Sequence, residues 1–197
     1  MKKLLVFLCS ISLMIGIAGV AGATVIDFES TLVGNYTSLN FADLTIHSGQ
    51  YTFQVYNETP GPPISHHALC NYTNNSAVTP FFVIFNIGNV TSFAIGVGDY
   101  NADVDNTYLE AYDAQNHLLA SDYYQNPANT YGGDYLSVVT GAPIAYVKFW
   151  DADPYPNCVY WDNLTYESSA VPEPATMLLL GSGLLGLAGL RRKFKKS

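Results

Sequence analysis

The sequence predicts an all-β protein whose main part is one antiparallel β-sandwich of the jelly-roll type. Three observations predict this class. Apolar residues alternate in short runs, and turn residues separate those runs. Tyr, Phe, Val and Thr, which suit pleated strands, are abundant between residues 24 and 167. The same stretch has no apolar stripe with the 3.6-residue period of a helix, and many short strands at this spacing are typical of sandwiches.

Ten strands are expected, and alternation defines their inner faces. Phe93, Ile95 and Val97, for example, fall on one face of their strand. Residues 24–167 suffice for one core and are too few for two ordinary domains, so a single domain is predicted, followed by a linker at 168–174. The expected strands span residues 24–29, 41–47, 51–56, 81–87, 92–97, 107–112, 117–122, 135–139, 144–150 and 159–166.

Residues 1–23 have the three parts of a secretory signal peptide. Lys2 and Lys3 give a positive start, residues 4–20 are apolar, and residues 21–23 have the A-x-A form of a cleavage site. We therefore expect signal peptidase to remove this segment and the mature protein to begin with Thr24.

The other end of the chain consists of three consecutive blocks. Val171-Pro172-Glu173-Pro174 is expected to be extended, because two prolines restrict its backbone. Residues 175–190 are apolar and uncharged; as a helix they would measure about 24 Å, slightly less than the ~30 Å hydrocarbon core of a membrane. A transmembrane helix with a cytoplasmic basic tail is therefore predicted at 175–197. The basic residues are Arg191, Arg192, Lys193, Lys195 and Lys196.

The order of Val-Pro-Glu-Pro, apolar helix and terminal basic cluster closely resembles the PEP-CTERM sorting signal of Gram-negative bacteria. The resemblance implies that a membrane-embedded exosortase processes the tail, after transient anchoring by the helix. It also implies that the protein reaches the cell envelope, the outer surface or the extracellular matrix. Such systems commonly accompany exopolysaccharide production, but the resemblance implies no activity for residues 24–167.

Charge is distributed very unevenly along the chain. Between residues 24 and 170, Lys148 is the only basic side chain beside fifteen acidic ones, a formal charge of −14, whereas the whole chain has −8. Such a surface repels phosphate groups, which excludes nucleic acid and anionic lipid as partners. Bound divalent cations would offset the self-repulsion; halophilic adaptation is the alternative explanation.

Two cysteines remain after Cys9 leaves with the signal peptide. Cys70 and Cys158 form an even pair in an exported domain, so one disulfide is predicted. Closing so long a loop contributes about 4–5 kcal/mol in the chain-entropy model. Two free thiols are the alternative.

Residues 57–80 are predicted to form a long polar connection, which the Cys70 disulfide would tie to the surface. A stapled surface loop is favoured over a functional one. His66 and His67 lie in this connection. Adjacent histidines point in different directions in most backbones, so a solvent-exposed pair is expected rather than a transition-metal site.

One acidic turn predicts a Ca²⁺ site. Its oxygen ligands at alternating positions are Asp99, Asn101, Asp103 and Asp105. With Glu110 they match the spacing of an EF-hand loop, but Val104 stands where that loop needs glycine and both flanks read as strands. Leu109 and Ala111 are expected on the inner face of their strand, so Glu110 between them is expected to point outward. Two interpretations stay open: a turn that binds Ca²⁺, and a hairpin turn in which Asp and Asn supply only turn chemistry.

A second candidate Ca²⁺ site joins the two ends of the domain. Asp27 and Glu29 lie near the mature N-terminus and Asp162 lies in the last expected strand. The chain resembles carbohydrate-binding modules of the jelly-roll type in strand count and composition, and that resemblance implies neighbouring first and last strands with a structural Ca²⁺ near them. Asp151 and Asp153 form a third acidic group. Hard oxygen ligands favour Ca²⁺ over zinc at all three places.

Fifteen tyrosines and two tryptophans all lie outside the targeting segments. Exposed aromatic rings beside Asn and Asp suit sugars, because a ring stacks on C–H faces while hydroxyls take hydrogen bonds. Core packing is the alternative for most of them. The aromatic residues that crowd the second half of the domain are Tyr123, Tyr124, Tyr131, Tyr135, Tyr146, Tyr155, Tyr160 and Trp161.

No motif predicts catalysis. The sequence of residues 24–167 contains no nucleophile elbow, phosphate-binding glycine loop or zinc-protease motif, so the protein is predicted not to be an enzyme. The sequence predicts an exported, non-catalytic envelope or matrix protein that binds exopolysaccharide with the help of Ca²⁺. The alternatives are a structural surface component without a ligand and, less favoured, a secreted glycoside hydrolase, which needs only two suitably spaced carboxylates.

Overall fold

The computed structural model describes residues 22–71, 78–100, 103–152, 159–169 and 181–183. Its contacts divide the chain into two compact units, Gly22–Ser169 on the one hand and Met1–Ala21 with Ala170–Ser197 on the other. In the second unit only residues 181–183 are described, and they form a single helical turn. The strands of the first unit are β1 (Ala23–Ile26), β2 (Gly34–Tyr36), β3 (Ser38–Asn40), β4 (Leu44–His47), β5 (Phe53–Asn57), β6 (His67–Cys70), β7 (Phe81–Phe85), β8 (Val90–Asp99), β9 (Asp105–Tyr112), β10 (Leu118–Asn126), β11 (Gly132–Ile144), β12 (Tyr146–Asp151) and β13 (Tyr160–Ser168).

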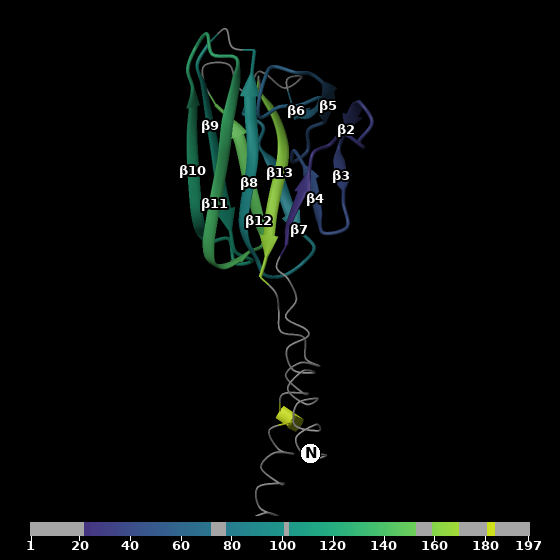
Figure 1. Cartoon of the computed structure of the whole chain (residues 1–197), viewed down its shortest axis with the longest axis vertical. Coiled ribbons are helices and arrows are strands. Elements are labelled where there is room, and N and C mark those ends of the chain that lie inside the picture. The colour runs from purple at the N-terminus through teal and green to yellow at the C-terminus, as the bar shows by residue number, and fades with distance from the viewer. Residues whose placement is uncertain (1–21, 72–77, 101–102, 153–158, 170–180, 184–197) are drawn as a thin grey trace, which may run out of the picture. The chain divides into compact units, whose positions relative to one another are not determined.

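These strands form two sheets (Figure 1). The seven-stranded sheet has the order β11-β8-β13-β6-β5-β2, and β1 also pairs with β13. The six-stranded sheet has the order β10-β9-β12-β7-β4-β3. Every pairing in both sheets is antiparallel. The predicted all-β, antiparallel class is confirmed.

Alternating side chains build one core from both sheets. In β9, Leu109 and Ala111 are fully buried while Glu110 between them is half-buried on the outer side, as the alternation predicts. Aromatic rings connect the sheets: Phe149 of β12 lies 4.7 Å from Trp161 of β13, measured between ring centroids. Each large apolar side chain buried in this way contributes about 1.5–3 kcal/mol of transfer free energy.

Ten of the strands correspond to predicted ones, whereas β2, β3 and β6 were not predicted. β6 corrects the expectation of one long connection over residues 57–80, because it forms an inner strand of the seven-stranded sheet between β5 and β13. Ala68, Leu69 and Cys70 are all buried, so this strand has no alternating pattern. β2 and β3 are three residues long, too short for a period to be visible.

β13 lies at the centre of the seven-stranded sheet. Along one edge it pairs with β8; along the other it pairs with β6 at Trp161 and with β1 from Leu164 onward. The register with β8 shifts between Asp162 and Thr165, and Asn163 in this interval has a φ of 51°. The extra residue is a β-bulge, a feature that often re-aims a neighbouring side chain. The bulge therefore lies where the partner of β13 along this edge changes from β6 to β1.

Residues 58–66 cross the outer face of the same sheet and contact its strands directly. The Gly133 amide donates a hydrogen bond to the Pro62 carbonyl oxygen at 3.0 Å. A Cβ atom at Gly96 would lie 2.7 Å from Cγ of Pro63, closer than side-chain atoms approach each other. Glycine in β8 is thus what allows this segment to lie directly on the strand.

Most of the predicted transmembrane helix and most of the predicted signal peptide lie outside the described residues. Cys158 lies outside them as well. Among the residues with a described position, no helix has the length and apolarity needed to cross a membrane.

Candidate functional site

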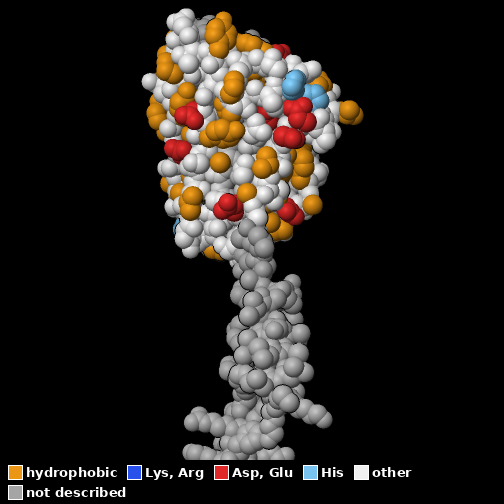
Figure 2. Space-filling model, viewed as in Figure 1, with side chains coloured by type: hydrophobic (Ala, Val, Ile, Leu, Met, Phe, Trp, Pro, Cys, Tyr) orange, Lys and Arg blue, Asp and Glu red, His pale blue; other side chains and the backbone are white. Residues whose placement is uncertain are grey.

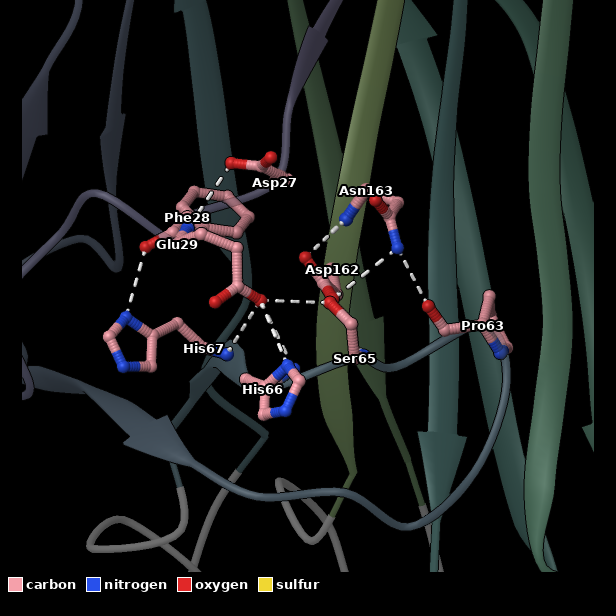
Figure 3. A network of polar contacts seen from close by, with 9 residues as sticks. All are labelled: Asp27, Phe28, Glu29, Pro63, Ser65, His66, His67, Asp162 and Asn163. Carbon is pink, nitrogen blue, oxygen red and sulfur yellow. Dashed lines mark hydrogen bonds and ion pairs between the residues drawn. The ribbon is translucent and has the colours of Figure 1, made fainter.

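Two predicted ligands from opposite ends of the domain, Glu29 and Asp162, come together around Ser65 (Figure 3). β1 pairs with β13, so the residues that follow β1 lie beside the bulge of β13. Ser65 Oγ lies 3.0 Å from Oε1 of Glu29 and 2.8 Å from Oδ2 of Asp162. The serine comes from the segment at 58–66, so three distant parts of the chain meet here.

Glu29 is held by several donors at once. Its Oε1 accepts hydrogen bonds from the amides of His66 at 3.2 Å and His67 at 3.3 Å, and the His66 ring lies 3.8 Å away. Desolvation opposes ionisation, but the His67 amide, the Ser65 hydroxyl and the His66 ring together hold the pKa of Glu29 below its ordinary value. Asp27 contributes to the turn, because its Oδ1 accepts the Glu29 amide at 3.2 Å.

Asp162 is fully buried and also surrounded by donors. Its Oδ2 accepts the Ser65 amide at 3.0 Å and its Oδ1 accepts the Asn163 amide at 2.6 Å. Asn163 Nδ2 donates to the Pro63 carbonyl oxygen at 2.7 Å, which fixes the crossing segment to the bulge. Burial raises the pKa of Asp162, the hydrogen bonds from Ser65 and Asn163 lower it, and the charge of Glu29 raises it, so that the pKa lies above its ordinary value. Protein donors bind Oε1 of Glu29 and both oxygens of Asp162, and these hydrogen bonds join the residues after β1 to residues 58–66 and β13.

The first predicted cation site places three carboxylates together beside Tyr160, at the same end of β13 as Asp162. Asp99 ends β8 and Asp105 begins β9, and one carboxylate oxygen of each, with one of Asp103, lies within 4.8 Å of the others. Asp105 is 1% exposed. Burial, with the charges of Asp99 and Asp103, raises the pKa of Asp105 to about 7, although a hydrogen bond from Asn126 acts in the other direction.

The remaining predicted ligands are placed as follows. Asn101 and Asp153 lie outside the described residues, and so does Cys158, the predicted partner of the buried Cys70. Asp151 is buried at the end of β12, opposite Thr107 of β9. The His66 side chain is largely exposed, as predicted, whereas His67 is partly buried and its Nδ1 lies 3.3 Å from the Phe28 carbonyl oxygen.

Aromatic rings gather on the outer face of the six-stranded sheet. Tyr123 of β10, Tyr108 of β9 and Trp150 of β12 are directly opposite one another in register. The Tyr123 and Tyr108 rings are 5.0 Å apart, and the Tyr108 and Trp150 rings are stacked at 5.2 Å. Further along the same strands, Tyr112 and Tyr146 stack at 4.9 Å. We call the row Tyr123, Tyr108 and Trp150 the aromatic row.

A charged pair lies between the two groups of rings. Lys148 Nζ lies 4.0 Å from the centroid of the Trp150 ring and 3.6 Å from Oε2 of Glu110. The Tyr112 hydroxyl donates to the same Glu110 oxygen at 2.6 Å. This hydrogen bond, with burial and the carboxylate charge, raises the pKa of Tyr112 to about 12. Ring stacking and this network together fix the side chains of the outer face.

A shallow, open depression lies at one end of the aromatic row, between β9 and β10. Tyr123 borders it and is 48% exposed, so this ring is accessible to a ligand. Both oxygens of Asp122 are used within the fold, because they accept the amides of Tyr123 and Ser137 at 2.8 Å each. The residues lining the depression are Tyr108, Leu109, Glu110, Ser121, Asp122 and Tyr123.

The structure changes the set of aromatic residues that lie on the outer face of the domain. Trp161, which the sequence suggests as a sugar-stacking residue, is 1% exposed and belongs to the core. Tyr108, Tyr112 and Trp150 were not singled out. Their alternation with the buried Leu109 and Phe149 indicates an outward position for each, but the pattern of one strand does not show which strand lies next to it.

A family model for the PEP-CTERM protein-sorting motif matches residues 170–193. The chain carries a PEP-CTERM sorting signal. This confirms the resemblance seen in Pro172, Glu173, Pro174 and the blocks after them. The PEP-CTERM signal implies export and sorting to the envelope surface by an exosortase.

Solved structures similar to the domain of this PEP-CTERM protein are remote. A DUF4465 family protein from Bacteroides caccae has 12% identity and a TM-score of 0.41, over 76% of this chain and 97% of that one. An arabinose-bound GH51 α-L-arabinofuranosidase has 9% identity and a TM-score of 0.45, over 77% and 27%. A mutant of the family 29 carbohydrate-binding module CBM29-2 has 12% identity and a TM-score of 0.36, over 75% and 92%. No curated protein matches the sequence.

Proposed function

We propose that this PEP-CTERM protein is an exported, non-catalytic surface protein whose two-sheet domain, of the jelly-roll sandwich type, binds exopolysaccharide. The proposed sugar site is the depression beside the aromatic row. The observation that carries the proposal is the ring of Tyr123, which is 48% exposed at the open end of three successive aromatic side chains. The PEP-CTERM signal supports the location, since export to the envelope surface brings the domain to extracellular glycans.

The chemistry of the depression suits a sugar ring. An exposed tyrosine face accepts the C–H face of a pyranose, and neighbouring polar groups take its hydroxyls. Ser121 is exposed on β10 and Glu110 is opposite it on β9, so a hydroxyl group and a carboxylate lie next to each other on the same face of the strand pair. Tyr108 stacks against Trp150 and contacts the Tyr123 ring on the neighbouring strand, which keeps the rings preorganised.

The same surroundings support a non-catalytic role. A glycoside hydrolase requires two available carboxyl groups, one of which must exchange a proton with the substrate. Of the two carboxylates at the depression, Asp122 accepts two backbone amides and Glu110 is held by Tyr112 and Lys148. Neither is placed as a free acid or base.

Affinity electrophoresis tests the proposal. The full-length chain, in a polyoxyethylene detergent without sugar groups, is run through gels containing the host's exopolysaccharide. We expect retardation of the wild type and about tenfold weaker binding of Tyr123→Ala, because a stacked ring is worth roughly 1–1.5 kcal/mol. Tyr135→Ala is the matched control, since Tyr135 is also 48% exposed but lies on β11 of the other sheet.

Equal binding by Tyr123→Ala and the wild type would exclude the depression as the sugar site. No retardation of the wild type would favour a structural surface component without a ligand. Release of reducing sugars by the wild type would instead favour the hydrolase.

A further inference from the structure

The acidic end of β8 and β9 contains a buried carboxylate oxygen without a hydrogen-bond partner. Asp105 is 1% exposed, and its Oδ2 finds no donor among the described residues. Asp103 Oδ2 is also buried and without a donor in the described part of the chain. These two residues and Asp99 place carboxylate oxygens within 4.8 Å of one another. Buried polar atoms normally have hydrogen-bond partners, so these two carboxylate oxygens lack the partner that such burial requires.

The protein supplies no cation for this cluster from its described residues. Within that part of the chain Lys148 is the only Lys or Arg, and its amino group lies over Trp150 beside Glu110. Figure 2 shows acidic groups and no Lys or Arg on the face it presents. Asp151, buried opposite Thr107, adds a further acidic side chain near this end. Crowded carboxylates in a buried place repel one another unless a proton or a cation lies between them.

We propose that Asp99, Asp103 and Asp105 bind one Ca²⁺ ion. All three ligands are carboxylates, and no His or Cys belongs to the cluster, so hard cations are favoured over zinc and copper. Ca²⁺ accepts carboxylates in variable geometry, whereas Mg²⁺ keeps several waters and requires a regular octahedron. The burial of Asp105 leaves less room for such a water shell.

The ion would connect the two sheets. Asp99 ends β8 of the seven-stranded sheet, and Asp105 begins β9 of the six-stranded sheet. Asn126 reinforces the same end, because its side chain donates to the Gly132 carbonyl oxygen at 3.1 Å and joins β10 to β11. A Ca²⁺ ion held by both strand ends thus stabilises the link between layers. The aromatic row uses none of these three acids, so this site and the glycan site are tested separately.

Calcium titration of the full-length chain, stripped with chelator and kept in the same detergent, provides the test. We expect one ion bound per chain by calorimetry. At a hundredfold excess over the dissociation constant we expect the unfolding midpoint to rise by about 5–10 °C. Asp105→Asn should abolish both effects. Asp134→Asn, which removes the same charge from an exposed position on β11, should retain them.

Asp103→Asn provides a second variant if Asp105→Asn does not fold, because Asp103 is only partly buried. The proposal is overturned if the wild type shows neither saturable heat nor a raised midpoint at about 10 mM Ca²⁺, well above the range of extracellular sites. It is also overturned if the folded variants keep the calcium response. An equal response to Mg²⁺ would refute the choice of Ca²⁺.

Discussion

At the scale of single residues, Asp162 illustrates how a carboxylate can be buried in an acidic domain. Ser65 and Asn163 donate to it, and this bonding offsets part of the loss of hydration. One hydroxyl proton on Ser65 Oγ nevertheless lies between Asp162 and Glu29 and cannot be donated to both at once. Burial raises the pKa of Asp162 and the charge of Glu29 adds to this effect, although the hydrogen bonds from Ser65 and Asn163 act in the other direction.

The raised pKa predicts a pH-dependent difference between the wild type and Asp162→Asn. It means that the folded state binds the proton more tightly than the unfolded state, whose pKa is near 3.8. The contribution of Asp162 to stability therefore falls as pH rises from about 4 through the raised pKa. The variant has no such proton, so its unfolding free energy relative to the wild type should increase over this interval. The increase should be about 1.4 kcal/mol for every tenfold difference in proton affinity between the folded and unfolded states.

Urea denaturation at pH 4 and pH 7 measures this difference. Glu29 and His66 face the same site and are present in both proteins, so the comparison reports on Asp162. A relative stability that is constant across this interval would contradict the raised pKa.

At the scale of elements, the contact between residues 58–66 and β8 depends on Gly96. A Cβ atom there would lie 2.7 Å and 3.0 Å from ring carbons of Pro63 and 3.1 Å from the Asp162 carbonyl oxygen. Neither a proline ring nor a backbone carbonyl can rotate away. We expect Gly96→Ala to lower the unfolding free energy by about 1–3 kcal/mol and to loosen residues 58–66.

Gly141→Ala is the control for this prediction, because nothing lies within 4 Å of the added methyl group at Gly141. Its stability should stay within about 0.5 kcal/mol of the wild type. Chemical denaturation gives both values, and limited proteolysis reports on the segment. Equal stabilities of the two variants would show that the segment does not lie on β8.

The same elements show what the sequence can predict. Alternation in residues 92–97 and around Leu109 predicts β8 and β9 and the outward position of Glu110, because both strands are long and direct alternate large apolar side chains into the core. β6 has no such pattern, since both of its faces are covered. The resemblance to carbohydrate-binding modules placed Glu29 near Asp162, but the position of Ser65 between them needed the strand order, which local patterns do not contain. Proximity of Asp99 and Asp105 was predictable because few residues separate them.

At the scale of the whole molecule, the excess of acidic residues predicts a salt-dependent stability. With a formal charge of −14 between residues 24 and 170, folding brings like charges together, and added salt screens their repulsion. We expect the unfolding midpoint to rise by a few degrees between about 10 mM and 500 mM choline chloride. The organic cation and a chelator separate screening from the proposed binding of Ca²⁺. A midpoint that falls with salt would mean that favourable ion pairs outweigh the repulsion.

The position of β13 also determines how the domain responds to mechanical force applied at its C-terminal end. The chain leaves the sheet at Ser168, so a load on an anchor beyond that residue enters β13 first. This strand is bonded along both edges, and a force along it must shear both ladders together instead of peeling one strand from a border. Its far end at Tyr160 pairs with Gly98, next to Asp99, about 26 Å away at the rise of a strand. A tethered molecule would therefore bear tension through a strand paired along both edges and hold Asp99, Asp103 and Asp105 away from the point of attachment.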